Sequence, residues 1–139
     1  MLLVDTNVWL AAADRRARRH GECLALLNAH RSDLASTAPV IAETAWLLLD
    51  RDGPNAQQQF IGSVLTGDIT VIDLTPADWH RVHELIAVYA DASLDIIDAS
   101  TIAAAERLNQ TTIATLDERD FRIIRPKHTD TFELLPGPA

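Results

Sequence analysis

The chain has 139 residues, of which 47% are hydrophobic and 23% are charged, so it is long enough for one soluble domain with its own core. Its formal net charge of -8 argues against loose, charge-driven binding of nucleic acid. The single cysteine, Cys23, excludes an intramolecular disulfide, and no apolar run approaches the ~20 residues of a membrane span.

The first half of the chain predicts two strands, each followed by helices. The expected elements are, in order, a strand at 2–4, helices at 8–13 and 21–30, a strand at 34–37, and helices at 39–50 and 56–65. Pro39 suits the first turn of a helix, and Asp52-Gly53-Pro54 breaks the helical pattern.

The second half continues the alternation. We expect a strand at 69–74, a helix from 76 to about 89, a helix capped by Ser93 that runs to 108, a strand at 112–115 and a short fifth strand at 123–124. Thr75 and Pro76 suit the cap and the first position of the helix that they begin. The stretch 134–139 ends in Pro-Gly-Pro-Ala, so we expect it to form no regular element and to be a mobile tail after a single domain at 1–133.

Strands that alternate with helices indicate an α/β fold with a mainly parallel sheet. In such sheets, ligands bind beyond the carboxyl ends of the strands. Asp5 directly follows the first predicted strand, and Asp117 follows the strand at 112–115. The pattern therefore places two carboxylates at the edge of the sheet where a ligand is expected.

Two further acids, Glu43 and Asp98, each interrupt an apolar helical pattern. If both met Asp5 and Asp117 in one cleft, four carboxylates would repel one another unless a divalent cation neutralised them. Mg²⁺ and Mn²⁺ prefer oxygen ligands and serve phosphoryl chemistry. The four acids thus indicate a metal-dependent enzyme that acts on phosphates.

Each acid also has a purely structural interpretation. Asp5 is a suitable helix cap, a Glu early in a helix such as Glu43 suits the helix dipole, and Asp117 suits a turn. Asp95 lies three residues before Asp98 on the same helical face, and a capping role fits Asp95 better than Asp98.

Near Asp117, we expect Asp120 to be exposed or paired with an arginine.

The basic residues are clustered in two segments, 15–20 and 119–127. Their arginines are good bidentate phosphate donors, yet solvated surface or a contact for an acidic partner explains them equally well. The candidates for RNA contact are Arg15, Arg16, Arg18, Arg19, Arg119 and Arg122.

Other chemistries find little support in the sequence. The glycines form no phosphate-binding loop, the histidines lack zinc-like spacing, and Cys23 has no evident base partner. A phosphatase of the haloacid dehalogenase kind needs a second acid two residues after its nucleophile, but position 7 is Asn.

Four motifs together resemble the PIN-domain ribonucleases, and specifically the VapC-type toxins of bacterial toxin–antitoxin pairs. They are Leu3-Val4-Asp5-Thr6-Asn7-Val8-Trp9, Val40-Ile41-Ala42-Glu43, Leu94-Asp95-Ile96-Ile97-Asp98-Ala99-Ser100, and Ile113 to Phe121. Each motif alone is weak, but their order and spacing span essentially the whole chain.

The resemblance implies a compact three-layer α/β/α sandwich that cleaves RNA with Mg²⁺ or Mn²⁺. It implies an acidic quartet of Asp5, Glu43, Asp98 and Asp117, with Asp5 and Asp98 as the surest direct metal ligands. Further residues match supporting polar or extra acidic positions: Thr6, Asn7, Thr115 and Asp95.

Because the sequence has nothing that resembles a signal peptide or a membrane span, we expect a cytoplasmic protein. The same resemblance implies a bacterial toxin, usually a homodimer, with a VapB-type antitoxin as partner. The alternative is a binding module on the same fold that captures RNA or a partner without cleaving it. The presence of all four acids favours the enzyme.

Overall fold

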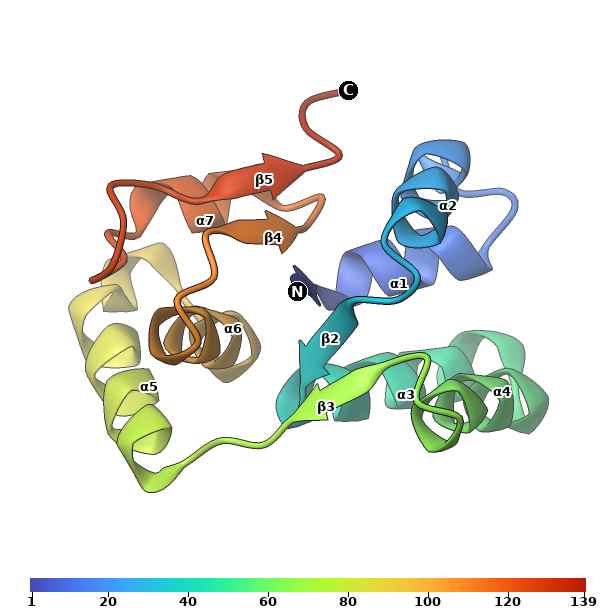
Figure 1. Cartoon of the computed structure of the whole chain (residues 1–139), viewed down its shortest axis with the longest axis horizontal. Helices are drawn as coiled ribbons and strands as arrows, with labels where there is room; N and C mark the ends of the chain where they lie inside the picture. The colour runs from blue at the N-terminus through green and yellow to red at the C-terminus, as the bar shows by residue number, and fades with distance from the viewer.

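The chain folds around a five-stranded sheet in which every neighbouring pair of strands is parallel. The computed structural model describes residues 1–139 (Figure 1). The strands lie in the order β3-β2-β1-β4-β5 and comprise β1 (Leu2–Val4), β2 (Leu34–Thr37), β3 (Thr70–Ile72), β4 (Thr112–Ala114) and β5 (Glu133–Leu135).

Seven α-helices and one short 3₁₀ segment connect and cover these strands. They are α1 (Thr6–Ala13), α2 (His20–Ala29), α3 (Ala38–Asp52), α4 (Pro54–Leu65), α5 (Pro76–Val88), the 3₁₀ segment Ala90–Ala92, α6 (Ile96–Arg107) and α7 (Glu118–Ile123). None of the helices combines the length and apolar character that a membrane span needs.

Two apolar clusters, one on each face of the sheet, define the three layers. Because side chains alternate along a strand, Leu3 and Ile113 pack on one face with residues of α5, α6 and α7. Leu2 and Val4 pack on the opposite face with residues of α1, α2 and α3. The predicted α/β/α sandwich is confirmed, and its sheet is wholly parallel.

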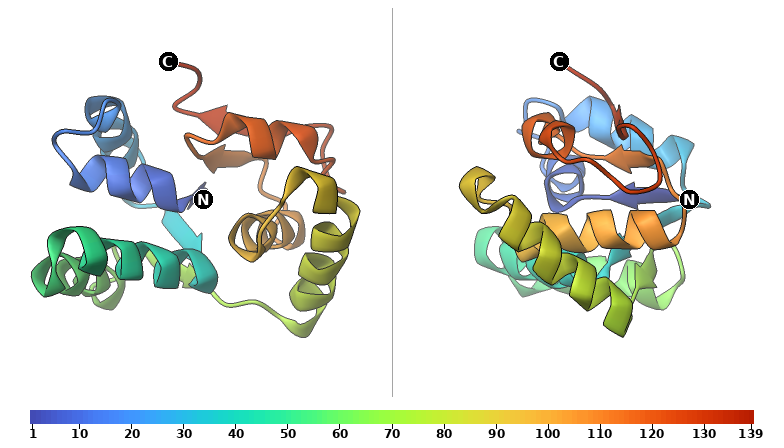
Figure 2. Two further views of the ribbon diagram at one scale, coloured as in Figure 1. Left: turned by 180° about the vertical axis from the view of Figure 1, so that it is seen from behind. Right: turned by 90° about the vertical axis from the view of Figure 1, so that its left-hand side faces the viewer.

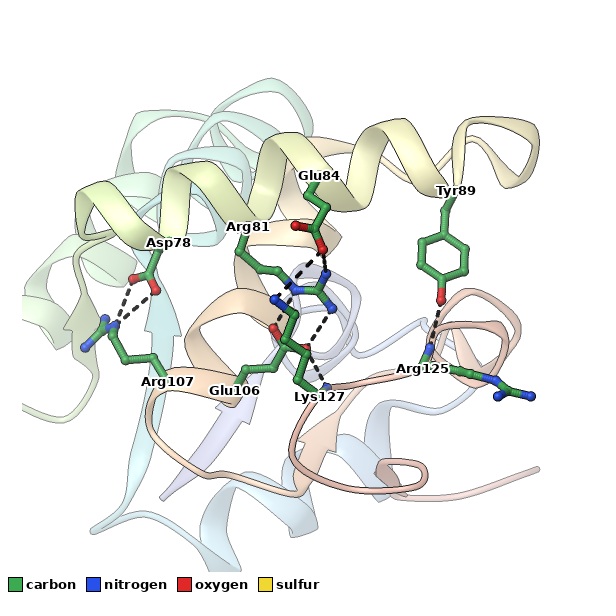
Figure 3. A network of polar contacts seen from close by, with 8 residues as sticks. All are labelled: Asp78, Arg81, Glu84, Tyr89, Glu106, Arg107, Arg125 and Lys127. Atoms are coloured by element: carbon green, nitrogen blue, oxygen red, sulfur yellow. Dashed lines mark hydrogen bonds and ion pairs between the residues drawn. The ribbon is translucent and has the colours of Figure 1, made fainter.

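Ion pairs fasten α5 to α6 on the outer side of the molecule (Figure 3). Arg81 contacts Glu106 at 2.7 Å, and Arg107 contacts the buried Asp78 at 2.9 Å. Glu106 also accepts a hydrogen bond from the backbone N–H of Lys127 at 2.8 Å, which ties the segment after α7 to the same pair of helices. This network holds α6, the helix that carries Asp98.

The C-terminal third departs from the sequence prediction in two elements. Ile123 ends helix α7 and Ile124 follows it, so the predicted strand at 123–124 is wrong; Phe121 and Ile124, three residues apart, are both buried in the core. The fifth strand is β5, which pairs with β4. Leu134 and Leu135 belong to it, so the expectation of irregular chain from residue 134 onward is also wrong.

The cap of α6 differs as well. Ser93 has a φ of 57° in the left-handed region, where it ends the 3₁₀ segment instead of starting a helix. Asp95 is the cap, because its carboxylate accepts a hydrogen bond from the Asp98 N–H at 2.9 Å. The capping interpretation of Asp95 is therefore correct, and it sets where Asp98 lies.

Candidate metal centre

The candidate site lies where the chain path through the sheet reverses direction. From the central strand β1 the chain builds β2 and β3 on one side, then crosses to build β4 and β5 on the other. In an open parallel sheet, the crevice at such a switch point is where ligands bind. Asp5 follows β1 and Asp117 follows β4, so both lie at this crevice.

Asp5 is buried, with only 4% of its surface exposed. One carboxylate oxygen accepts a hydrogen bond from the Thr6 N–H at 2.9 Å, which caps α1, and the other accepts from the Thr115 hydroxyl at 2.9 Å. Burial nevertheless raises the pKa of Asp5 to about 6, with Glu43 and Asp117 adding repulsion. The fold therefore holds this carboxylate in place while leaving its charge poorly compensated.

The Thr115 hydroxyl connects the acids of the two strands. Besides donating to Asp5, it accepts a hydrogen bond from the Asp117 N–H at 3.0 Å. The Asn7 side chain donates to the same hydroxyl at 3.5 Å and accepts from the Leu116 N–H at 3.0 Å. Thr115 and Asn7, both expected as supporting residues, thus fix the loop that follows β4.

Asp98 lies in the first turn of α6, where Asp95 caps the helix. Burial, as the largest cause, and the charges of Asp5, Asp95, Asp117 and Asp120 together raise the pKa of Asp98 to about 8; no hydrogen bond to the carboxylate opposes them. Asp98 is the carboxylate whose ionised form the protein itself stabilises least.

All four predicted acids line one hollow of ≈ 270 Å³, which we call the acid pocket. Its lining comprises Asp5, Thr6, Asn7, Leu10, Glu43, Leu47, Ser93, Asp95, Ile97, Asp98, Asp117 and Asp120. Glu43 reaches it from the second turn of α3. No lysine, arginine or histidine is among the lining residues, so nothing basic from the protein offsets the carboxylates.

Asp120 was missed as a site residue by the sequence interpretation. It was expected on the surface or beside an arginine, but it is half-buried, lines the acid pocket, and forms none of the ion pairs of the structure. Its carboxylate oxygen and those of Asp98 and Asp117 all lie within 4.8 Å of one another. Burial, followed by the neighbouring Asp117, raises the pKa of Asp120.

A local signal could have located Asp120. Asp117 caps α7 by accepting a hydrogen bond from the Asp120 N–H at 3.4 Å. Residues three apart at a helix start share a face, so an Asp-x-x-Asp pair directly beyond a strand places both carboxylates at the same edge.

The six candidate arginines lie outside the acid pocket, and three of them pair with acids. Arg19 contacts Glu22 at 2.6 Å and donates to the Gly137 carbonyl at 2.5 Å, and its side chain is only 14% exposed. Arg16 pairs with Asp14 at 3.3 Å, and Arg122 pairs with Glu118 at 2.9 Å. The remaining three are exposed: Arg15, Arg18 and Arg119.

The donor set suits a hard divalent cation. The pocket offers carboxylate oxygens and no thiolate or imidazole, and oxygen-rich sites select Mg²⁺, Mn²⁺ or Ca²⁺ over softer metals. Burial first, and then repulsion from neighbouring acids, raises the pKa of Asp5 and of Asp98, and a bound cation would compensate the charge of these buried carboxylates.

Comparisons with known proteins identify the fold and the family. The chain is 25% identical to Ribonuclease VapC26 of Mycobacterium tuberculosis over 135 residues, which cover 97% of this chain and 100% of that protein. Among solved structures, VapC20 of Mycobacterium tuberculosis, described as a toxin that cleaves the sarcin–ricin loop, matches with a TM-score of 0.75 and 21% identity, covering 81% of this chain and 87% of that one.

A DNA-bound VapBC complex from Salmonella typhimurium matches with a TM-score of 0.69 and 12% identity, over 96% of this chain and 95% of that one. The PIN domain family matches residues 2–125, which confirms the resemblance drawn from the motifs. The chain belongs to the PIN domain family.

Proposed function

We propose that this PIN domain is a metal-dependent endoribonuclease and the toxin of a toxin–antitoxin pair in the bacterial cytoplasm. The observation that carries the proposal is the convergence of carboxylates from four separate segments into one hollow without a basic side chain. Similarity to Ribonuclease VapC26 over almost the whole length of both chains supports the ribonuclease assignment.

Within the pocket we assign Asp5 and Asp98 as direct ligands of Mg²⁺ or Mn²⁺, with Glu43 and Asp117 acting directly or through water. Asp120 joins them on the strength of its position beside Asp98 and Asp117. A bound divalent cation would supply charge neutralisation, activation of water and polarisation of the scissile phosphate.

The chain's own groups prepare this chemistry by fixing the carboxylates before the substrate arrives. The Thr6 N–H and the Thr115 hydroxyl orient Asp5, and the cap at Asp95 sets the start of the helix that carries Asp98. Loss of such a contact to a ligating carboxylate typically lowers metal affinity or activity by about ten- to a hundredfold.

The proposed partners are RNA as substrate, a VapB-type antitoxin and a second copy of the chain. Solved structures that match this fold include VapBC of Rickettsia felis bound to a fragment of its promoter DNA, with a TM-score of 0.67 over 96% of both chains. At 18% identity this likeness concerns the fold, and it is the reason to seek an antitoxin for this chain.

The direct test is induced expression followed by mapping of new RNA 5′ ends, with wild type compared against Asp98→Asn. New ends are expected with the wild type only, and purified wild-type protein should cleave RNA with Mg²⁺ or Mn²⁺ but not with EDTA. If Asp98→Asn cleaves at the wild-type rate, the site assignment is wrong. Metal-dependent RNA binding by the wild type without cleavage would favour the non-cleaving module.

A further inference from the structure

A second hollow, which we call the arginine hollow, adjoins the acid pocket. It measures ≈ 270 Å³ and is lined by Leu10, Asp14, Arg16, Leu48, Arg51 and Asp52. Leu10 lines both hollows, and Leu47 of the acid pocket directly precedes Leu48 of the arginine hollow. The two hollows therefore meet over leucine side chains between α1 and α3.

Helices α1 and α3 lie side by side (Figure 2, left), and each of them contributes lining residues to both hollows. Asp5 caps α1, whose C-terminal end reaches Asp14, and α3 carries both Glu43 and Arg51. With a rise of 1.5 Å per residue, these pairs are separated by roughly 13 Å and 12 Å along the helices. A short stretch of a nucleic-acid strand can therefore contact both hollows.

The arginine hollow is lined by two acids, Asp14 and Asp52, and by two arginines whose guanidinium groups are available to a phosphate. Arg51 is exposed and forms none of the ion pairs of the structure. Arg16 is bound to Asp14 only through its backbone N–H, at 2.9 Å, and its Nε, at 3.3 Å. Its two terminal amino groups stay free, and its side chain is 88% exposed.

We infer that the arginine hollow is a phosphate subsite, in which Arg16 and Arg51 bind the RNA backbone a short distance along the strand from the scissile bond. Guanidinium groups match phosphate oxygens bidentately, and an apolar floor such as Leu10 and Leu48 provides contact for a base or ribose. The inference rests on the proposed function and names where the substrate strand runs.

This subsite explains how a chain with a net charge of -8 can hold a polyanion. Carboxylates in the acid pocket repel a phosphate until a cation neutralises them, so the neighbouring phosphate needs its own cationic contact. Arg19 cannot provide it, because Glu22 and the Gly137 carbonyl occupy its guanidinium. Arg51 lies outside the two basic segments of the sequence, 15–20 and 119–127. Helix α3 places it in the arginine hollow together with Arg16.

The test measures binding of a fluorescent single-stranded oligouridylate, in Mg²⁺, to protein that carries Asp98→Asn and so does not cut the probe. Adding Arg51→Gln or Arg16→Gln is expected to weaken binding about fivefold to tenfold. Each change should also lower the slope of log affinity against log salt by about 0.7, the value for one phosphate contact on a single strand.

Arg31→Gln is the matched control, since Arg31 is also exposed and lines a different hollow. It should change the affinity by less than about twofold, because it removes only a distant surface charge. Equal losses for Arg31→Gln and Arg51→Gln, or no loss for Arg16→Gln and Arg51→Gln, would overturn the subsite.

Cleavage kinetics of the wild type, Arg16→Gln and Arg51→Gln, measured beside the binding assay, separate this inference from the proposed function. If RNA binds in an Arg51-dependent manner but wild-type protein never cleaves it, the subsite stands and the nuclease proposal fails. If cleavage occurs and its KM for RNA is unchanged in Arg16→Gln and Arg51→Gln, the nuclease proposal stands and the subsite is overturned. Absence of RNA binding in the assay together with absence of RNA cleavage by the wild type overturns both.

Discussion

Replacing Asp98 by Asn should stabilise the metal-free protein, although it removes a proposed metal ligand. The Asp98 carboxylate is half-buried, faces four other acids and receives no hydrogen bond that lowers its pKa. Asparagine has nearly the same shape but carries no charge. The substitution therefore removes the repulsion without leaving a cavity.

The magnitude follows from the pKa of Asp98, which rises from 3.8 to about 8 in the folded chain. Between pH 3.8 and 7 this group is ionised in the unfolded chain but largely protonated in the folded chain. At about 1.4 kcal/mol per pH unit, the free energy of unfolding would therefore fall by roughly 4 kcal/mol over this range. Solvent screening at a partly exposed carboxylate reduces this to about 1–2 kcal/mol.

The pH dependence has a definite sign. Because the folded pKa is raised, the contribution of Asp98 to stability is fully present below pH 3.8 and is lost as the pH rises toward about 8. The advantage of Asp98→Asn should therefore be absent at pH 3.8 or below and largest near pH 8.

Thermal melts in EDTA provide the assay. Near pH 7.5 the variant should melt higher by roughly 3–8 °C, given the usual relation between stability and melting temperature for a domain of this size. Saturating Mn²⁺ should reverse the order, because only the wild type gains the full free energy of metal binding. An equal or lower melting temperature for Asp98→Asn in EDTA would refute the idea of uncompensated charge.

Other predictions follow from single contacts. Thr115→Val removes the hydroxyl between Asp5 and the Asp117 N–H, so Mn²⁺ affinity measured by calorimetry should fall roughly tenfold or more; an unchanged affinity would show that this hydroxyl is dispensable. Asp120→Asn should weaken Mn²⁺ binding to a similar extent, whereas Glu118→Gln, which changes an acid outside the pocket, should not. Mn²⁺ affinity should fall as the pH is lowered from 8 to 6, because protons compete for Asp98 and Asp5, whose pKa values are raised to about 8 and about 6; a flat profile would contradict those values. Glu106→Gln should lower the free energy of unfolding in urea by about 2 kcal/mol, because it leaves the mostly buried Arg81 with only the exposed Glu84 as its carboxylate partner; Glu84→Gln, which removes that exposed partner, serves as the comparison.

The site was predictable where it depends on the regular parts of an α/β fold. Asp5 and Asp117 follow apolar strands, and the rule that ligands bind beyond strand ends places both of them without further information. Separating Asp98 from Asp95 needed only the preference of helix starts for an acidic cap. The expected order of strands and helices through residue 89 depends on similar local signals.

The parts that escaped prediction depend on contacts between distant segments. Strand β5 is short and forms by pairing with β4. The residues of β5 alone give no signal that predicts this pairing. Helix α7 is a six-residue helix with mostly charged side chains and a single buried residue, Phe121, so its hydrophobic periodicity is too brief to recognise. Missing α7 led directly to the wrong placement of Asp120.

The central position of β1 gives the two walls of the acid pocket different mechanical properties. Asp5 follows a strand that has a neighbour on each side, and both of its oxygens are already held. Asp98 stands on the first turn of α6, and no hydrogen bond holds its carboxylate. A cation in the pocket would therefore have one ligand that the protein holds in place and one that is free to turn. Adjustment to cations of different radius would fall to Asp98, with Asp5 as the fixed reference point.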